Sequence, residues 1–520
     1  MNQGRRRSCD RSALVRCVLV VCLAGAGLMA SGACRRETAR PQSQVSFRIG
    51  MGLGGTSLQS GLPVLINMLF ADSLIAVGWN GRPTPRLAES WTWEDDGRTL
   101  RLFLRAGATF HDGRPVTSDE VLPVLQRALK EARNTDYFGG FAYVESVEAS
   151  DDRTIVLRLS RPDAFLLNEL TNTTIVASDD PNVGTGPFRI VTRVPHLEFE
   201  RYGRYYRGVP AIERVEIATY ESQRSAWAAM MRGEVDMVQE VARESVDFLQ
   251  GSSEIETYSS LKPFYIPLVF NLRHPILGRV EARRAVTEAI DRSQIVGDAM
   301  RSHGRIADDP VWPSHWAYST AARRYTYNPV AARLRLDAAG LPIRSAAPGQ
   351  MASRFHFTCL FWSEDPQFER IALLLQRQLS DVGVDMALEP ATLRNLIKRI
   401  GANDFDAYLF QVNSGRSFDW TYRYWHSPQP GIPLMQDSGY AGADAILERL
   451  RAARSDNETR TAVADLQQRF YEDAPAVFLA WQETTRAVDA RFSLGDRTNL
   501  DIFANIWQWR PVEPTRRAAR

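Results

Sequence analysis

The residues with the most recognisable chemistry lie between positions 413 and 426, where amide, arginine and aromatic side chains stand close together in the sequence. The candidate ligand-binding residues here are Gly415, Arg416, Trp420, Tyr422 and Trp425. Aromatic rings beside hydrogen-bonding groups are typical of clefts that hold small molecules, and arginine suits a carboxylate or a phosphate. The same rings also suit a packed core, so composition alone leaves both interpretations open.

The motifs of common enzyme classes are missing from the sequence. None of the seven histidines forms an H-E-x-x-H pair, and there is no C-x-x-C zinc pair, no G-x-S-x-G nucleophile motif and no phosphate-binding G-x-x-x-x-G-K loop. We therefore expect no metal, no cofactor and no catalytic residue. A secreted hydrolase whose two acids lie far apart in the chain stays as a remote alternative.

The first 33 residues have the pattern of an export signal. Basic residues precede an apolar run from Cys17 to Ala30, which is too short to span a bilayer. Small residues then precede Cys34, as in the cleavage site of a bacterial lipoprotein. We expect Cys34 to be lipidated and to anchor the chain to a membrane through a tether over residues 34–45. An ordinary secretory signal, cut near Ala33, is the alternative.

Length and composition exclude several other classes of protein. A chain of 520 residues exceeds one ordinary core, and 44% hydrophobic with 24% charged residues is a globular balance. The formal net charge of +2 argues against a nucleic-acid partner. Without residues 1–33 only Cys34 and Cys359 remain, so no disulfide framework is expected. Cys359 lies in an apolar run and is predicted to be a buried small hydrophobe.

Patterns of helices and strands alternate along the chain, which predicts an α/β protein of several domains. Strands are expected near residues 100–104, 155–159, 384–388 and 476–481. Helices are expected over 118–132, 222–233, 280–303 with a break at Asp291, 371–382, 441–454 and 458–473. Domains joined by short connections are typical of hinged lobes with a ligand between them.

Short motifs in a fixed order resemble those of one protein family, the extracytoplasmic solute-binding proteins of ABC importers, family 5 (the oligopeptide, dipeptide and nickel type). The similar motifs include residues 85–91 (PRLAESW), 104–117 (LRAGATFHDGRPVT), 183–188 (VGTGPF), 205–208 (YYRG) and 232–236 (RGEVD). Further matches continue the series to Pro475, so the resemblance covers roughly residues 65–490. Each motif is weak alone, but the ordered series is specific.

This resemblance implies a fold: a two-lobed periplasmic-binding-protein fold of class II and the large cluster C type, with a hinge between the lobes. Lobe I would comprise residues 46–70, 172–270 and 486–520, with an extra subdomain inserted over 71–171, and lobe II would comprise 271–485. The FHDG stretch around His111 would be a structural turn rather than a His/Asp site. The implied mechanism is closure of the lobes around a ligand, with no bond made or broken.

The resemblance also implies a function and partners. The chain would be a periplasmic or envelope lipoprotein that captures a peptide or other small polar solute and delivers it to an ABC permease and ATPase complex. The family favours a monomer. An orphan or sensor protein of the same fold, with a non-peptide ligand, is the alternative.

One departure from the family bears on the ligand. Peptide binders of this type commonly hold the peptide's amino terminus with an Asp in lobe II, and Gly415 or a neighbour falls at that position, with Asp419 a few residues later. Because a buried ammonium without a carboxylate partner is strongly unfavourable, a free amino terminus is not expected. Arg416 or Arg423 would instead suit an anionic group.

Four more aromatic residues complete the set of candidate ligand contacts. Three belong to the expected inserted subdomain, and one follows the expected strand that contains Cys359. They are Tyr137, Phe138, Tyr143 and Trp362.

Overall fold

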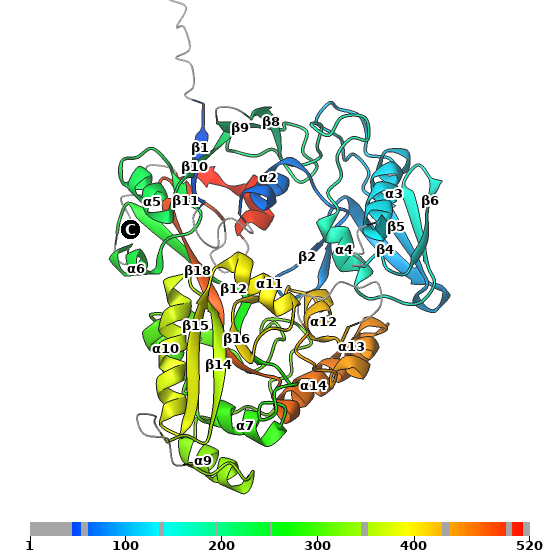
Figure 1. The fold of residues 1–520 in the computed structure, drawn as a ribbon. Coiled ribbons are helices and arrows are strands. Elements are labelled where there is room, and N and C mark those ends of the chain that lie inside the picture. The colour runs from blue at the N-terminus through cyan, green and yellow to red at the C-terminus, as the bar shows by residue number, and fades with distance from the viewer. Residues whose placement is uncertain are drawn as a thin grey trace, which may run out of the picture. The chain divides into compact units, whose positions relative to one another are not determined.

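The structure is a computed structural model that describes residues 44–53, 61–134, 140–193, 196–249, 252–344, 352–428, 437–495 and 502–512 (Figure 1). Cys34, Tyr137 and Phe138, three residues of the predicted sites, lie outside the described residues. Among the helices of the described ranges, none is long and apolar enough to cross a membrane.

One twelve-stranded sheet runs through the described structure, in the order β15-β14-β16-β12-β18-β11-β1-β10-β9-β8, with β13 and β17 off this path (Figure 1). At its middle, β12 (Ile255–Phe270) pairs antiparallel with β18 (Ala476–Asp489). The pairing begins at Ile255 opposite Asp489 and ends at Val269 opposite Ala476, with a shift in register between Leu261 and Tyr265. Two cores lie on either side of this strand pair.

The first core surrounds β1 (Ser46–Gly52), which lies between two parallel neighbours. Alternate residues of β1, Phe47 and Ile49, are fully buried beside Phe199 and Trp509. The other elements of this side are β8 (Phe188–Thr192), β9 (Leu197–Arg201), β10 (Arg214–Tyr220), β11 (Met237–Val238), β19 (Phe492–Ser493), β20 (Arg510–Pro511), α2 (Leu62–Phe70), α5 (Gln223–Met231), α6 (Arg243–Val246), η2 (Asp247–Leu249) and η4 (Ile502–Gln508).

The second core surrounds β14 (Phe355–Trp362), which pairs in parallel with β15 (Val384–Ala391) and β16 (Ala407–Leu409). Its nearly continuous apolar sequence fits a parallel strand that is covered on both faces. The helix α10 (Pro366–Ser380) begins at Asp365, whose side chain accepts a hydrogen bond from Gln367 N. Further elements are α7 (Val280–Glu288), α8 (Arg292–Gln294), η3 (Ile295–Ala299), α9 (Pro329–Ala338), α11 (Leu393–Gly401), α12 (Asp419–Trp425), α13 (Asp444–Arg451), α14 (Asp456–Asp473), β13 (Gly304–Ile306) and β17 (Val412–Asn413).

A separate four-stranded antiparallel sheet, in the order β4-β5-β7-β6, has its own core between Leu74 and Ala177. Alternation along β5 places Leu100, Leu102 and Leu104 in this core, as predicted. The elements are β4 (Ala88–Glu94), β5 (Thr99–Leu104), β6 (Val144–Asp151), β7 (Thr154–Leu159), α3 (Ser118–Asn134), α4 (Leu166–Asn172), η1 (Asp95–Gly97) and the two-stranded β2 (Ile75–Val77) with β3 (Pro83–Pro85).

Most of the predicted elements are confirmed, with shifted ends. The expected break at Asp291 separates α7 from α8, because the Asp291 carboxylate accepts hydrogen bonds from Ser293 N and Gln294 N. The strand expected over 476–481 is longer, since β18 continues to Asp489. Cys359 is a free, fully buried cysteine, as predicted, and burial raises the pKa of its thiol.

The interpretation of His111 as a structural residue is also confirmed. Its ring joins the FHDG turn to the glycine-rich turn at 183–188: Gly184 N donates to Nδ1 at 3.3 Å, and Nε2 lies 3.0 Å from the oxygen of Gly186. A neutral ring with its proton on Nε2 satisfies both contacts. Burial lowers the pKa of His111 to about 4, which favours this neutral form.

A buried ion pair connects the four-stranded region to α13. Arg451 Nη2 lies 2.7 Å from Asp163 Oδ2, and both side chains are almost fully buried. The Arg451 guanidinium also lies 4.3 Å from the ring centre of Tyr143 and 5.1 Å from that of Tyr422. Phe165, two residues after Asp163, packs into the second core. The two regions therefore meet through a desolvated charge pair surrounded by rings.

We predict that Asp163→Asn lowers the free energy of unfolding by about 3 kcal/mol, because Arg451 would keep a buried charge without its partner. Denaturant unfolding measures the effect. Arg161→Gln is the matched control: Arg161 pairs with Glu448 at the same junction, but that pair is partly exposed and should contribute at most about 1 kcal/mol. Equal effects of the two substitutions would contradict the prediction.

We predict a pH dependence of stability from Asp309. Burial raises the pKa of its carboxyl to about 7, although Gln467 Nε2 and Val311 N donate hydrogen bonds to it. Between the unfolded value of about 3.9 and pH 7, the folded chain holds a proton that the unfolded chain has lost. This contribution is therefore complete below about pH 4 and is lost as the pH rises through 7.

The wild-type free energy of unfolding should accordingly fall by up to about 1.4 kcal/mol per pH unit across this interval because of Asp309. Asp309→Asn removes the titrating group, so its unfolding curves at pH 5, 6, 7 and 8 should differ less from one another. The same slope in both proteins would refute the assignment.

Candidate binding cavity

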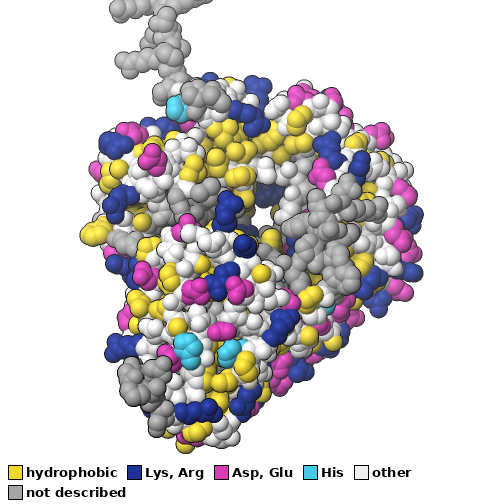
Figure 2. Space-filling view, in the orientation of Figure 1, with side chains coloured by type: hydrophobic (Ala, Val, Ile, Leu, Met, Phe, Trp, Pro, Cys, Tyr) yellow, Lys and Arg dark blue, Asp and Glu magenta, His cyan; other side chains and the backbone are white. Residues whose placement is uncertain are grey.

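A cavity of about 1380 Å³ is walled by residues from both sides of the β12–β18 pair. One wall comes from α2, β3, α4 and η4, and the other from α11, α12 and the segment 408–417. On the face drawn in Figure 2 the molecule is hollowed near its centre, with Lys and Arg side chains at the rim of the hollow. A cavity of this size admits a ligand larger than a single amino acid.

Three of the predicted contacts, Gly415, Arg416 and Trp420, line this cavity. Gly415 has a φ of +68°, and a β-carbon there would lie 2.9 Å from Cδ1 of Trp420. Asn413 Oδ1 accepts a hydrogen bond from Gly415 N at 2.8 Å, which holds the turn. The glycine therefore lets the chain turn tightly while Trp420 lies against its backbone.

The two other candidates on α12 point away from the cavity. Successive residues of a helix are about 100° apart, so Trp420, Arg423 and Tyr424 share one face, and all three line the cavity. Tyr422 and Trp425 lie on another face and are buried: Trp425 Nε1 donates to Tyr265 Oη at 2.8 Å. The ring of Tyr422 lies 5.6 Å from that of Phe165.

Tyr143 and Trp362 also lie outside the described lining of the cavity. Tyr143 packs against Arg451 and Arg161, at the junction with the four-stranded region. Trp362 is buried in the second core, and its Nε1 donates to Glu364 Oε2 at 3.1 Å. Each ring thus has a packing partner that explains its position.

Sequence reasoning missed the charged residues of the opposite wall. Arg86 and Arg207 converge on η4, where both donate to the carbonyl oxygen of Ala504, at 3.0 and 3.3 Å. Arg86 also lies 3.5 Å from Asp72, whose other carboxylate oxygen accepts a 2.8 Å hydrogen bond from Tyr205. Both arginines and Tyr205 lie in motifs that signalled the family, PRLAESW and YYRG, but nothing in those motifs indicated a cavity wall.

Two buried carboxyls lie behind the α12 face. Burial raises the pKa of Asp419 and of Glu169, while Arg423, whose Nη2 lies 3.5 Å from Glu169, opposes the shift at both. Asp419 also accepts a 2.5 Å hydrogen bond from Ser417. Arg423 thus reaches the cavity with a carboxylate beside it.

The rest of the described lining is aromatic and amide in character, including Trp79, Phe264, Phe410, Trp507 and Asn168. The indole nitrogens of Trp79 and Trp507 are buried and have no hydrogen-bond acceptor among the described residues. The described lining contains no histidine, cysteine, lysine or glutamate. No cluster of three potential metal ligands was found in the described ranges. This arrangement of rings, amides and arginines can hold a solute.

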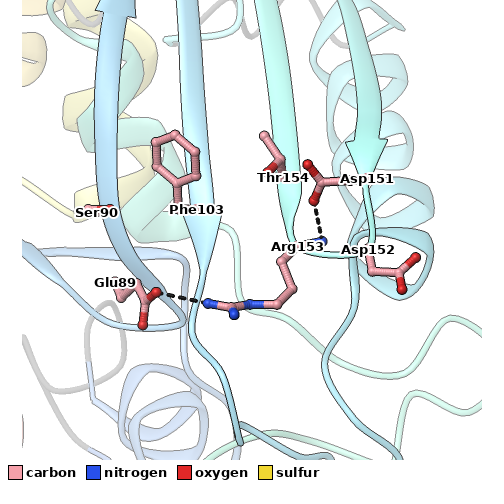
Figure 3. Close-up of a pocket in the computed structure, with 7 residues that line it drawn as sticks. All are labelled: Glu89, Ser90, Phe103, Asp151, Asp152, Arg153 and Thr154. Atoms are coloured by element: carbon pink, nitrogen blue, oxygen red, sulfur yellow. Dashed lines mark hydrogen bonds and ion pairs between the residues drawn. The ribbon is translucent and has the colours of Figure 1, made fainter.

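A second, shallower pocket lies on the four-stranded sheet, lined by Glu89, Ser90, Phe103, Asp151, Asp152, Arg153 and Thr154 (Figure 3). Its charged groups bind one another: Arg153 Nη2 lies 2.9 Å from Glu89, and Arg153 N donates to Asp151 Oδ1 at 2.9 Å. It is therefore a self-paired surface groove, and the cavity beside α12 is the stronger candidate.

Comparison with known proteins agrees with this geometry. Residues 82–432 match the family model of the bacterial extracellular solute-binding proteins, family 5 (middle). The chain belongs to this family. The match includes α12 and both arginine-bearing motifs of the opposite wall.

Individual relatives extend the likeness over most of the chain. The probable D,D-dipeptide-binding periplasmic protein DdpA of Escherichia coli is 24% identical over 76% of this chain and 78% of its own length. The structure of CtaP from Listeria monocytogenes, an ABC transporter substrate-binding protein, has a TM-score of 0.77 at 20% identity, over 90% of this chain and 100% of that one. AgaA from A. tumefaciens, solved with agropinic acid, has a TM-score of 0.69 at 21% identity and covers 90% and 99%.

This solute-binding protein thus has the two-lobed α/β fold that the resemblance implied, and it also has a separate four-stranded sheet. β12 and β18 pair between the two cores, and residues from both sides of this pair line the cavity.

Trp420→Ala should raise the Kd for the bound solute by tenfold or more (~1.4 kcal/mol), and so lower the fraction of purified protein that carries it, without a large change in melting temperature. Native mass spectrometry and thermal unfolding give the two readouts. Trp425→Ala is the contrasting variant: it empties a buried site and should cost about 3–5 kcal/mol of stability. A large loss of stability in Trp420→Ala with unchanged solute binding would place Trp420 in the core.

Proposed function

We propose that this chain is the solute-binding component of an ABC importer, which captures a peptide or another small polar solute and delivers it to a membrane permease. The observation that carries the proposal is the cavity of about 1380 Å³ between the lobes, lined by aromatic, amide and arginine side chains from both. DdpA is named for dipeptide binding and AgaA was solved with agropinic acid, so relatives with this fold hold both peptides and other solutes.

The mechanism follows from where the contacts lie. A solute that touches α12 of lobe II and η4 of lobe I gains the full set of contacts when the lobes close, so it favours the closed state. The hinge consists of β12 and β18, with lobe II over residues 271–485 and lobe I formed by the segments before and after it. No chemical step is needed, and we propose that the protein is not an enzyme.

We further propose that the protein is exported, anchored through a lipid on Cys34, and works as a monomer with a permease and ATPase complex. The signal-like residues 1–33 and the small residues before Cys34 support the anchor. A lipid anchor on Cys34 and a short tether would keep the binding lobes near the membrane, where the permease lies.

Expression of the full chain in a bacterial host tests this proposal. We expect the protein in the membrane fraction, and native mass spectrometry of the gently purified protein should detect a bound small solute that denaturation releases. Cys34→Ala should move the protein to the soluble fraction and leave the solute in place. A protein that carries no solute, and whose melting temperature does not respond to peptides, opines or amino-acid derivatives, would contradict the binding function.

A further inference from the structure

We propose that the cavity selects solutes with a carboxylate, and that Arg207 is the residue that binds this group. The proposal rests on the binding function proposed above and specifies the ligand of the same cavity. Nothing in the family match assigns a role to Arg207.

The charge of the described lining is strongly one-sided. Four of its residues carry guanidinium groups, Arg86, Arg207, Arg416 and Arg423, and one carries a carboxylate, Asp72. A cavity lined with charges of one sign attracts ions of the other sign and repels its own. A solute with a net positive charge is therefore disfavoured.

The described carboxylates near the cavity already have cationic or hydrogen-bonding partners. Oδ1 of Asp72 lies 3.5 Å from Nη1 of Arg86, and Oδ2 accepts a 2.8 Å hydrogen bond from the Tyr205 hydroxyl. Glu169 lies 3.5 Å from Arg423. Neither acid can bind a ligand ammonium without losing its contact with an arginine. This agrees with the absence of an ammonium-binding Asp at or near Gly415.

Arg207 differs from Arg86 and Arg423 because the contacts of its guanidinium in the described structure are uncharged. Its Nη1 donates to the carbonyl oxygen of Ala504 and its Nη2 to Oδ1 of Asn505, both at 3.3 Å, and no carboxylate of the described residues lies within ion-pair distance. These two long hydrogen bonds leave other N–H groups of the Arg207 guanidinium available to bind an anion.

The surroundings of Arg207 hold it in position. Its guanidinium lies 5.3 Å from the ring centre of Trp507, and Arg86 donates to the same Ala504 oxygen. Trp507 contributes an indole N–H without an acceptor among the described residues. A carboxylate, which only accepts hydrogen bonds, would satisfy donors that the protein leaves unsatisfied.

The apolar residues of the lining indicate the remainder of the solute. Val64 and Met68 of α2 and Ile397 of α11 line the cavity and are 46%, 39% and 54% exposed, respectively. Exposed apolar side chains that border a cavity from both lobes suit an apolar group of the ligand. The expected solute therefore combines a carboxylate with an apolar or aromatic part.

Three probes with the same side chains test the proposal: N-acetyl-Leu-Phe as the free acid, its C-terminal amide, and Leu-Phe amide with a free amino group. Titration calorimetry with the chain without residues 1–33 should show that the acid binds at least about tenfold more tightly than the neutral amide or the cationic probe. One charge-assisted hydrogen bond contributes about this much to an affinity. Arg207→Gln should remove that preference and leave the affinity for the amide unchanged. Arg204→Gln, which removes an exposed arginine of the same loop outside the lining, is the matched control and should keep the preference.

Equal binding of acid and amide, tighter binding of the cationic probe, or an acid affinity that Arg207→Gln leaves intact would each overturn the carboxylate proposal. Failure of all three probes to bind would overturn it too. These outcomes leave the binding function standing if the protein purified from cells carries a solute, whereas an empty and unresponsive protein would contradict the binding function itself.

Discussion

The pairing of β12 with β18 is the constraint on which the rest of the described structure depends. The sheet continues outward from this pair in both directions, through β11 and β1 to one core and through β16 and β14 to the other. The ladder is interrupted between Leu261 and Tyr265, where Pro263 and Phe264 leave their pairing with β18 and line the cavity. Proline has no N–H to donate, but the Pro263 oxygen accepts a 2.8 Å hydrogen bond from Ser414 N. The irregularity that bends the strands thus also attaches the α12 loop to them.

The charges of the cavity follow from this arrangement. Two of the arginines are balanced by an acid: Arg86 by Asp72 within one wall, and Arg423 of α12 by Glu169, which belongs to α4 of the other wall. Because both acids are largely buried, each stabilises its arginine in an environment of low dielectric constant, where an unpaired charge would be unfavourable. Arg207 depends instead on a backbone carbonyl and an amide oxygen, which orient a guanidinium without neutralising it. The neutralising charge then has to come from the solute.

The sequence predicted the fold well because its strongest signals are local. The continuous apolar run of β14, the alternation in β5 and the cap at Asp291 each depend on neighbours within a few residues, and the structure confirms them. The cavity was harder to predict because its walls combine segments that are hundreds of residues apart, such as Arg86, Arg207 and Trp507. Within α12, however, a local rule was available. The helical spacing separates Trp420, Arg423 and Tyr424 from Tyr422 and Trp425, so the aromatic cluster could have been divided into a cavity face and a core face from the sequence alone.

The buried pair of Asp163 and Arg451 has a consequence for how this chain can change over evolutionary time. The two residues lie 288 positions apart but share one desolvated site, closed by the rings of Tyr143, Phe165 and Tyr422. A single substitution of either residue passes through a form with an uncompensated buried charge, whereas replacing both by apolar residues of matching volume can be neutral. The two positions therefore form one heritable unit, and descendants of this chain should retain both charges or neither.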